Sequence, residues 1–239
     1  MKKNFGGVYL LLSTLLICLL YLSFTYAKPV RESAPLSTVS AVGFTLFSPA
    51  YDSLQTELPG LSREAFEYAI KGYHKLIAEG RLNNQSIISI ADFSQSSRNK
   101  RLYIIDLAQS KVLFNTWVAH GRNSGGEMAT NFSNQLASYK SSPGFYITKG
   151  TYVGSHGYSL KLDGIEKGIN DNANNRAIVM HGADYVNPIT FKVLGFLGRS
   201  QGCPAVPAQL SIPIIKTIKD GTCLFIYHPS YVKRSALLG

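Results

Sequence analysis

The stretch GRSQGCPAVP, residues 198–207, places one cysteine between a glycine and a proline. Cys203 lies 22 residues after His181, which closes the apolar run AIVMH of residues 177–181. A thiol and an imidazole that both end apolar segments are the minimum components of an activated sulfur nucleophile. If the fold brings these two side chains together, the sequence predicts an enzyme that transfers acyl groups.

The residues around Cys203 fit this chemistry. Thiol catalysis needs a thiolate, a base that takes its proton and donors for the oxyanion. Gly202 lets the backbone approach a substrate carbonyl closely, so we expect the amides of Gly202 and Cys203 to point at it. Arg199 is near in sequence and favours the thiolate. His181 is the expected base, because a strand end would hold it rigidly.

Two further histidines share the local pattern of His181. His120 and His156 are each followed by glycine, as His181 is. Loops on a rigid scaffold often carry function, so the three pairs predict loops gathered around one site; alternatively, each glycine only turns the chain. No His or Cys pair has the short spacing of a zinc site, and no GxSxG motif or nucleotide-binding loop is present. We therefore expect no metal and no organic cofactor.

Residues 1–27 have the pattern of a targeting segment. Lys2 and Lys3 precede a leucine-rich run without charge over residues 6–26, and the small residues that follow suit cleavage before Lys28. The run is also long enough to span a bilayer, so an uncut signal anchor that tethers the protein to the membrane is the alternative. Either form predicts export to the periplasm or cell envelope.

The rest of the chain predicts two segments. Residues 28–60 hold four prolines and many Ser and Thr, and we interpret them as a linker or lead-in. Residues 61–239 are expected to form one catalytic domain with an N-terminal helix, and their length suits a single sizeable core.

The charge of the chain bears on its partners. The formal net charge is +10, and loss of residues 1–27, which hold two lysines and no acid, leaves +8. Export argues against nucleic acid and favours polyanions of the envelope, such as acidic stem peptides of the wall or phospholipid headgroups. The alternative is that the charge only keeps the protein soluble. Nothing in the pattern defines an oligomeric state.

Two cysteines, Cys203 and Cys223, lie beyond the targeting segment, and an oxidising compartment permits a bond between them. Cys223 stands in the strand-like run TCLFIY, residues 222–227, where a free thiol serves as a small hydrophobe. We therefore expect two free thiols and keep a disulfide as the alternative.

The hydrophobic pattern predicts a mainly β domain with a few helices. One helix is expected between Ser62 and Gly80, and a short one near residues 207–219, interrupted or restarted at Pro213. The apolar stripe of the first helix is a packing face. Runs of β-branched and aromatic residues predict strands over residues 86–93, 101–107, 111–119, 144–148, 159–162, 177–180 and 222–227.

Several motifs, in order, resemble the murein L,D-transpeptidase catalytic-domain family, a branch of the YkuD-like fold. The resemblance covers roughly residues 100–228. Its motifs are HGRNSG (120–125), FSN (132–134), SSPGFY (141–146), SHGYSLKLDG (155–164), NDNA (170–173), RAIVMHGADY (176–185) and GRSQGCPA (198–205). The resemblance implies a β-sandwich or mixed sheet of the YkuD-like type.

The resemblance also implies an activity on peptidoglycan stem peptides. Cys203 would attack the carbonyl of the diamino acid at position three and expel the terminal D-alanine. The thioester would then pass to an amine of another stem, which gives a 3–3 cross-link. In this scheme His181 is the base, the Gly202 and Cys203 amides bind the oxyanion, and Ser200 helps to orient the imidazole.

One departure from the better-known members concerns substrate binding. Those members place histidine directly before the Gly-Cys pair and arginine shortly after the cysteine, whereas this chain has Gln201 and then Pro204. Arg199 and Arg176 are candidates for the missing carboxylate-binding arginine, by charge and proximity, and His156 and His120 are further candidates for substrate binding.

Two other functions stay open from the sequence. An L,D-carboxypeptidase would use the same residues with water as the acceptor. A non-catalytic wall-binding protein would have Cys203 and Cys223 joined in a disulfide.

Overall fold

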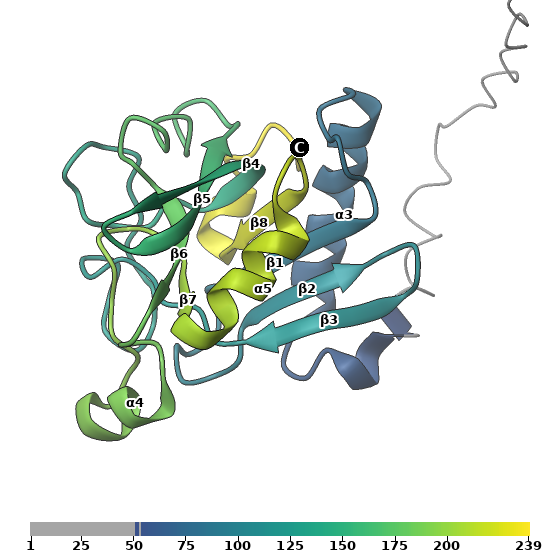
Figure 1. Ribbon diagram of the computed structural model, residues 1–239. Helices are drawn as coiled ribbons and strands as arrows, with labels where there is room; N and C mark the ends of the chain where they lie inside the picture. Colours follow the sequence, from purple (N-terminus) through teal and green to yellow (C-terminus); the bar gives the residue numbers. More distant parts are fainter. Residues whose placement is uncertain (1–50, 53) are drawn as a thin grey trace, which may run out of the picture. The chain divides into compact units, whose positions relative to one another are not determined.

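Eight strands form one mixed sheet, seen in the computed structural model of the chain (Figure 1). The structure describes residues 51–52 and 54–239, which belong to a compact unit spanning Val42–Gly239. The predicted leader and residues 28–50 of the predicted lead-in lie outside the described residues. None of the helices in the described part is long and apolar enough to cross a membrane.

The strands are β1 (Ile87–Asp92), β2 (Leu102–Asp106), β3 (Lys111–Thr116), β4 (Gly144–Gly154), β5 (Gly157–Gly164), β6 (Val179–Ala183), β7 (Ala205–Pro207) and β8 (Cys223–Tyr227). Their order across the sheet is β3-β2-β1-β8-β4-β5-β6-β7. Only the β1–β8 and β6–β7 pairs are parallel. The predicted class, mainly β with a few helices, is confirmed, and the described strands all belong to a single mixed sheet.

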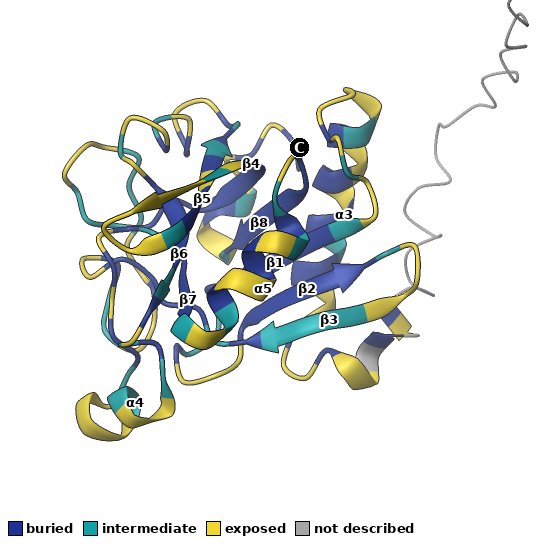
Figure 2. Ribbon diagram, viewed as in Figure 1, coloured by how far each residue is buried: buried dark blue, intermediate teal, exposed yellow. Residues whose placement is uncertain are grey.

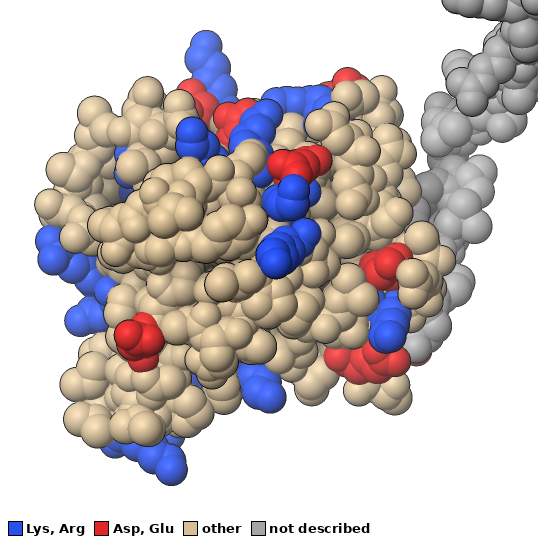
Figure 3. Space-filling model, viewed as in Figure 1, with Lys and Arg blue, Asp and Glu red and all other residues tan. Residues whose placement is uncertain are grey.

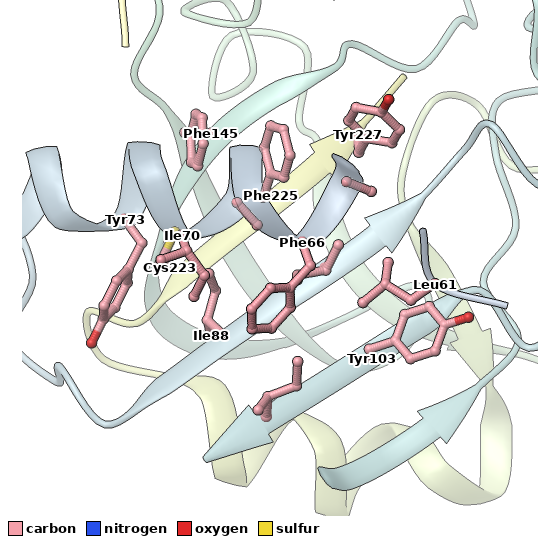
Figure 4. Close-up of a cluster of buried hydrophobic side chains, with 14 of the residues drawn as sticks. Leu61, Phe66, Ile70, Tyr73, Ile88, Tyr103, Phe145, Cys223, Phe225 and Tyr227 are labelled. Atoms are coloured by element: carbon pink, nitrogen blue, oxygen red, sulfur yellow. The ribbon is translucent and has the colours of Figure 1, made fainter. Parts of the chain in front are cut away.

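Helices α3 (Arg63–Ala78) and α5 (Ala208–Ile218) cover opposite faces of the sheet. The other described helices are η1 (Gln55–Glu57), α4 (Pro188–Leu194) and α6 (Pro229–Val232). One apolar cluster lies between α3 and the sheet, and it includes Phe66, Tyr103 and Phe225 (Figure 4). A second cluster, with Met180 and Ile214, lies on the α5 side. Figure 2 shows the resulting buried centre, in dark blue, under an exposed rim.

Helix α3 forms as the sequence predicts. The Ser62 hydroxyl accepts a hydrogen bond from the amide of Ala65 at 3.1 Å, which caps the first turn. The predicted stripe faces the sheet, with Phe66 and Ile70 almost fully buried. The helix therefore contributes one wall of the first core.

The predicted lead-in extends too far along the chain. Tyr51, Leu54 and Leu58 are 6%, 1% and 2% exposed and belong to the core cluster under α3. The Tyr51 hydroxyl also donates to the carbonyl of Leu61 at 2.7 Å. Residues 51–60 are therefore part of the folded domain, because their apolar side chains are buried despite the surrounding Ser, Thr and Pro residues.

Helix α5 is continuous through Pro213, so the predicted interruption is wrong. Proline removes one hydrogen bond from a helix interior. Here that loss is offset by the burial of Ile214, Ile215 and Ile218 against the sheet.

Four elements were not predicted, the short helices η1 and α6 together with α4 and β7. Asn187 caps α4 by accepting from the amides of Ile189 and Thr190, and Gly195 ends it with φ +81°. An Asn-Pro start and a glycine end are recognised helix signals that could have identified this helix. β7 has only three residues and exists through its pairing with β6, which no local pattern reveals.

We expect Gly72→Ala to destabilise the protein, although alanine favours helix by about 1 kcal/mol. A Cβ at Gly72 in α3 would lie 2.0 Å from the Phe145 ring of β4, so overpacking should cost about 1–3 kcal/mol. Urea unfolding checks this. Phe145→Leu removes the ring atoms that the new Cβ would meet. The double variant should therefore lose less stability than the sum of the losses in the two single variants. Strictly additive losses would contradict the proposed clash.

Candidate active site

The Cys203 sulfur lies against strand β6. The amide of Val179 donates to Sγ at 3.5 Å, and the thiol donates to the carbonyl of Ala177 at 3.7 Å. Two residues later β7 begins, and it pairs Ala205 with His181. Val179 and His181 are two residues apart on β6, about 7 Å along the strand, and their side chains share one face. The structure thus brings the predicted nucleophile and the predicted base to the same strand.

The turn that carries Cys203 is closed by Ser200. The Ser200 hydroxyl donates to the Cys203 carbonyl at 2.6 Å and accepts from the Gly202 amide at 3.1 Å. Ser200 therefore shapes the turn and has no contact with the imidazole that the resemblance implied. The same bond occupies the Gly202 amide, so it does not face a substrate carbonyl as expected. Among the described residues no acceptor binds the Cys203 amide, which leaves it available to an oxyanion.

Gly202 itself is required by the backbone. Its φ is +121°, a region that side chains other than glycine rarely adopt. A Cβ there would also lie 2.8 Å from the Lys140 carbonyl. The Gly202 carbonyl accepts from the Ser141 hydroxyl at 3.2 Å, so the turn is tied to the loop at residues 138–142.

His181 is held in one tautomer. It is 2% exposed and is the third residue of β6, whereas the sequence predicted it at a strand end. Its Nδ1 lies 2.9 Å from the Gly182 carbonyl. Because a carbonyl only accepts, Nδ1 carries the proton and Nε2 keeps a lone pair. Burial, above all, lowers the pKa of His181, with a smaller lowering from His156 and an opposing rise from the Gly182 bond.

His156 stacks on His181. The two rings are 4.3 Å apart between centroids and are inclined by 19°. His156 comes from the exposed turn between β4 and β5, so two of the three His-Gly pairs meet as predicted. Two stacked imidazoles repel one another when both are charged, and this favours neutral His181.

The thiol is also neutral at rest. Burial raises the pKa of Cys203, and the Val179 amide and the Arg176 charge offset this only in part. The expectation that the turn favours a thiolate through Arg199 is therefore wrong, because burial outweighs the nearby positive charge and that charge comes from Arg176. If the base is a neutral imidazole and the nucleophile a neutral thiol, the proton moves only when substrate is attacked.

The two arginine candidates have different environments. The Arg176 guanidinium donates to the carbonyls of Ser133 and Lys140 and to two serine hydroxyls, so it mainly holds the loop at residues 133–142. Arg199 is exposed, donates to the carbonyls of Arg122 and Gly125 and lies 4.8 Å from the Phe196 ring centroid. Of the two, Arg199 is the one open to a ligand.

His120 does not face the site. It is 1% exposed, its Nδ1 lies 2.8 Å from the guanidinium of buried Arg101, and its Nε2 lies 3.3 Å from the Gly125 carbonyl. Arginine only donates, so Nδ1 must be unprotonated. Its predicted substrate-binding role is therefore replaced by a structural one: its backbone carbonyl accepts from the Ser200 amide at 3.0 Å and so supports the cysteine turn.

Tyr185 was not predicted, although it lies in the quoted motif at residues 176–185. Burial raises the pKa of Tyr185 to about 12, and the charge of a Cys203 thiolate acts in the same direction. The ring also lies against Gly198, where a Cβ would be 2.4 Å from the Tyr185 Cβ. Tyr185 therefore belongs to the surroundings of the thiol. Tyr185 lies in a loop after β6, and no local sequence pattern there indicates that its ring packs near the cysteine turn.

Both thiols in the described residues are free. Cys223 is fully buried in the cluster under α3, whereas Cys203 packs against the cluster on the α5 side. The two clusters lie on opposite faces of the sheet. The alternative of a Cys203–Cys223 disulfide is thus wrong, because the sheet separates the two sulfurs. No three His, Cys, Asp or Glu side chains of the described chain are placed to hold a metal ion.

Comparison with known proteins decides the family. A model of the L,D-transpeptidase catalytic domain matches residues 57–227. The chain belongs to the L,D-transpeptidase catalytic-domain family. No protein of curated function matches this sequence. The match includes Cys203, His181 and all eight strands, so this L,D-transpeptidase domain begins before the boundary at residue 61 that the sequence predicted.

Several solved structures resemble this L,D-transpeptidase domain. An L,D-transpeptidase from Mycobacterium smegmatis is 10% identical over 60% of this chain and 59% of that chain, with a TM-score of 0.37. One from Stackebrandtia nassauensis is 13% identical over 78% of each chain, with a TM-score of 0.36. The helical cell shape determining protein Pgp2 from Campylobacter jejuni is 14% identical over 70% of this chain and 57% of that chain, with a TM-score of 0.40. The chain thus spans less than two thirds of the first and third of these structures.

We expect the free energy of unfolding to decrease less steeply at low pH in His120→Asn than in the wild type. The pKa of His120 is lowered to about 3, mainly by burial and then by Arg101. Between pH 6.5 and 3 the unfolded chain binds a proton that the folded chain does not. The free energy of unfolding therefore decreases by up to about 1.4 kcal/mol for each unit by which the pH is lowered. Asparagine keeps an acceptor for Arg101 and does not titrate. Urea unfolding at several pH values measures the slope, and equal slopes would contradict the assignment.

The rate of Cys203 acylation should decrease at low pH, where His181 becomes protonated. We expect His156→Phe to shift this acidic limb of the pH profile to higher pH. The lowered pKa of His181 keeps Nε2 unprotonated below the ordinary value of 6.5, and part of the lowering comes from His156. Phenylalanine preserves the stacking and removes the charge. The pH profile is obtained by measuring the rate at which an acylating reagent labels Cys203 at several pH values. A limb that stays in place or moves to lower pH would exclude this role.

Proposed function

We propose that this protein is a peptidoglycan L,D-transpeptidase that forms a thioester between Cys203 and a stem tetrapeptide. The observation that carries the proposal is the position of the Cys203 sulfur, bonded to the Val179 amide of the strand that holds His181. A nucleophile and a base fixed to one strand need little rearrangement before attack.

The reaction divides into two half-reactions. His181 Nε2 takes the thiol proton as sulfur attacks the carbonyl of the third residue of the stem, and the Cys203 amide donates to the oxyanion. The carbon–nitrogen bond to the terminal D-alanine then breaks, and the departing amine takes the proton from His181. The thioester passes to an amine, often the side chain of another stem's diamino acid, which gives a 3–3 cross-link.

A carboxypeptidase is the second candidate, and the partial exposure of Cys203 favours it. A side chain that is only partly buried leaves a thioester on its sulfur within reach of water. With water as the acceptor the same residues would trim the stem to a tripeptide.

We further propose that the protein acts in the periplasm or cell envelope, because its substrate lies there and residues 1–27 have the pattern of an export signal. That segment is either cleaved or kept as a membrane tether. The formal charge of +10 suits an acidic polymer as the partner.

We expect incubation with a defined stem tetrapeptide to add the mass of the tripeptide acyl group to the wild-type protein and nothing to Cys203→Ala. Intact-protein mass spectrometry measures the adduct. The matched control is Cys223→Ala, which removes a buried thiol from the other face of the sheet and should still form the adduct. An adduct on Cys203→Ala, or none on wild type, would refute the thioester mechanism.

The products of the same incubation separate the two candidates. Addition of an amine acceptor should give the cross-linked peptide if the protein is a transpeptidase. Release of tripeptide alone, with the amine present in excess, would identify a carboxypeptidase.

A further inference from the structure

A cavity of about 510 Å³ lies beside His181. Its walls come from the turn between β4 and β5 with His156 and Tyr158, the segment after β6 with Asp184 and Tyr185, and the start of α5 with Ser211. Asp184 is the only Asp, Glu, Lys or Arg among the lining residues. A basic protein thus has, beside His181, a cavity whose only fixed charge is negative.

The Asp184 carboxylate has no partner within the protein. Across residues 51–52 and 54–239 no ion pair and no hydrogen bond involves its carboxylate, and only its backbone carbonyl is bound, by the side chain of Asn187. The cavity also presents the rings of Tyr158 and Tyr185. A carboxylate beside aromatic rings is a favourable environment for an ammonium group.

The cavity adjoins the reacting groups on two sides. His156, in its wall, stacks directly on His181 at 4.3 Å. Tyr185, also in the wall, packs against Gly198, and its carbonyl accepts from the Gly198 amide at 3.2 Å, in the segment that leads to Cys203. The cavity is thus connected through its walls to the proposed base and to the segment that carries the thiol.

We propose that this cavity binds the acyl acceptor as a primary ammonium ion, with Asp184 as its counter-ion. The inference rests on the proposed function and adds to it the site and the recognition of the second substrate. Acidic groups of the donor stem are repelled by Asp184, so the donor occupies the side of Cys203 that carries Arg199. Figure 3 shows acidic side chains scattered singly or in small groups on the viewed face, without a wide acidic patch.

The ammonium held by Asp184 loses one proton to solvent and becomes the amine, whose nitrogen attacks the thioester carbon. The new carbon–nitrogen bond forms and the carbon–sulfur bond breaks. The second proton of the nitrogen passes to His181 Nε2 and from there to the departing sulfur, which restores the thiol and the neutral imidazole.

The test uses Asp184→Asn and follows the fate of the preformed thioester. The wild-type protein is acylated with the stem tetrapeptide, a primary amine that is cationic at neutral pH is added, and the ratio of aminolysis to hydrolysis is measured. Asp184 is exposed, so we expect Asp184→Asn to lower this ratio at most about fivefold, the upper effect of one exposed ion pair. With hydroxylamine, which is uncharged at neutral pH, the ratio should stay the same.

The matched control is Asp163→Asn, which removes an exposed carboxylate paired with Lys149, outside the cavity. This control should leave the ratio unchanged with both nucleophiles. Equal ratios in wild type and Asp184→Asn, an equal loss with both nucleophiles, or a similar loss in the control would each overturn the inference. Absence of a thioester in the wild type would instead refute the proposed function, so the two failures are distinguishable.

Discussion

The geometry of the thiol depends on hydrogen bonds between loops, because the residues on the N-terminal side of Cys203 belong to no strand or helix. Ser200 closes the turn, its amide is bound by the carbonyl of His120, and the Gly202 carbonyl is bound by Ser141. These loops are buried where they meet, so a lost bond there would leave an unsatisfied polar group. The sulfur is therefore positioned by three segments that are far apart in the sequence.

The buried Arg101–His120 pair extends this frame into the core. Burial lowers the pKa of Arg101 to about 9, so the site holds a charge at a cost in stability. That cost is offset by bonds to the carbonyls of Val118 and Gln95 and to neutral His120. The cation fixes the histidine tautomer and thereby the path of the segment that supports Ser200. One buried charge is in this way connected to the cysteine turn without contacting it.

The predictable features were those set by local pattern. The stripe of α3 and the strand runs follow from hydrophobic spacing, and Cys203 and His181 stand out by residue type. His120 and His156 have the same local His-Gly pattern, yet one is buried on Arg101 and the other stacks on His181. Only the tertiary partner distinguishes them. For the same reason the sequence did not predict β7 or single out Asp184. A three-residue strand and a single acidic residue are defined by contacts with residues that are distant in the chain.

The electrostatics of the site favour a sequence of two substrates over simultaneous binding. Burial raises the pKa of Cys203 and lowers that of His181, so the pair rests without charge, and ionisation of the thiol requires a carbonyl to accept the electrons. Arg199 is exposed near the turn, whereas Asp184 lines the cavity beside His156. Under the proposed mechanism an acidic donor and a cationic acceptor would therefore meet opposite charges. The neutral imidazole of His181 would take a proton in the first half-reaction and again in the second, as the proposed thioester transfer requires.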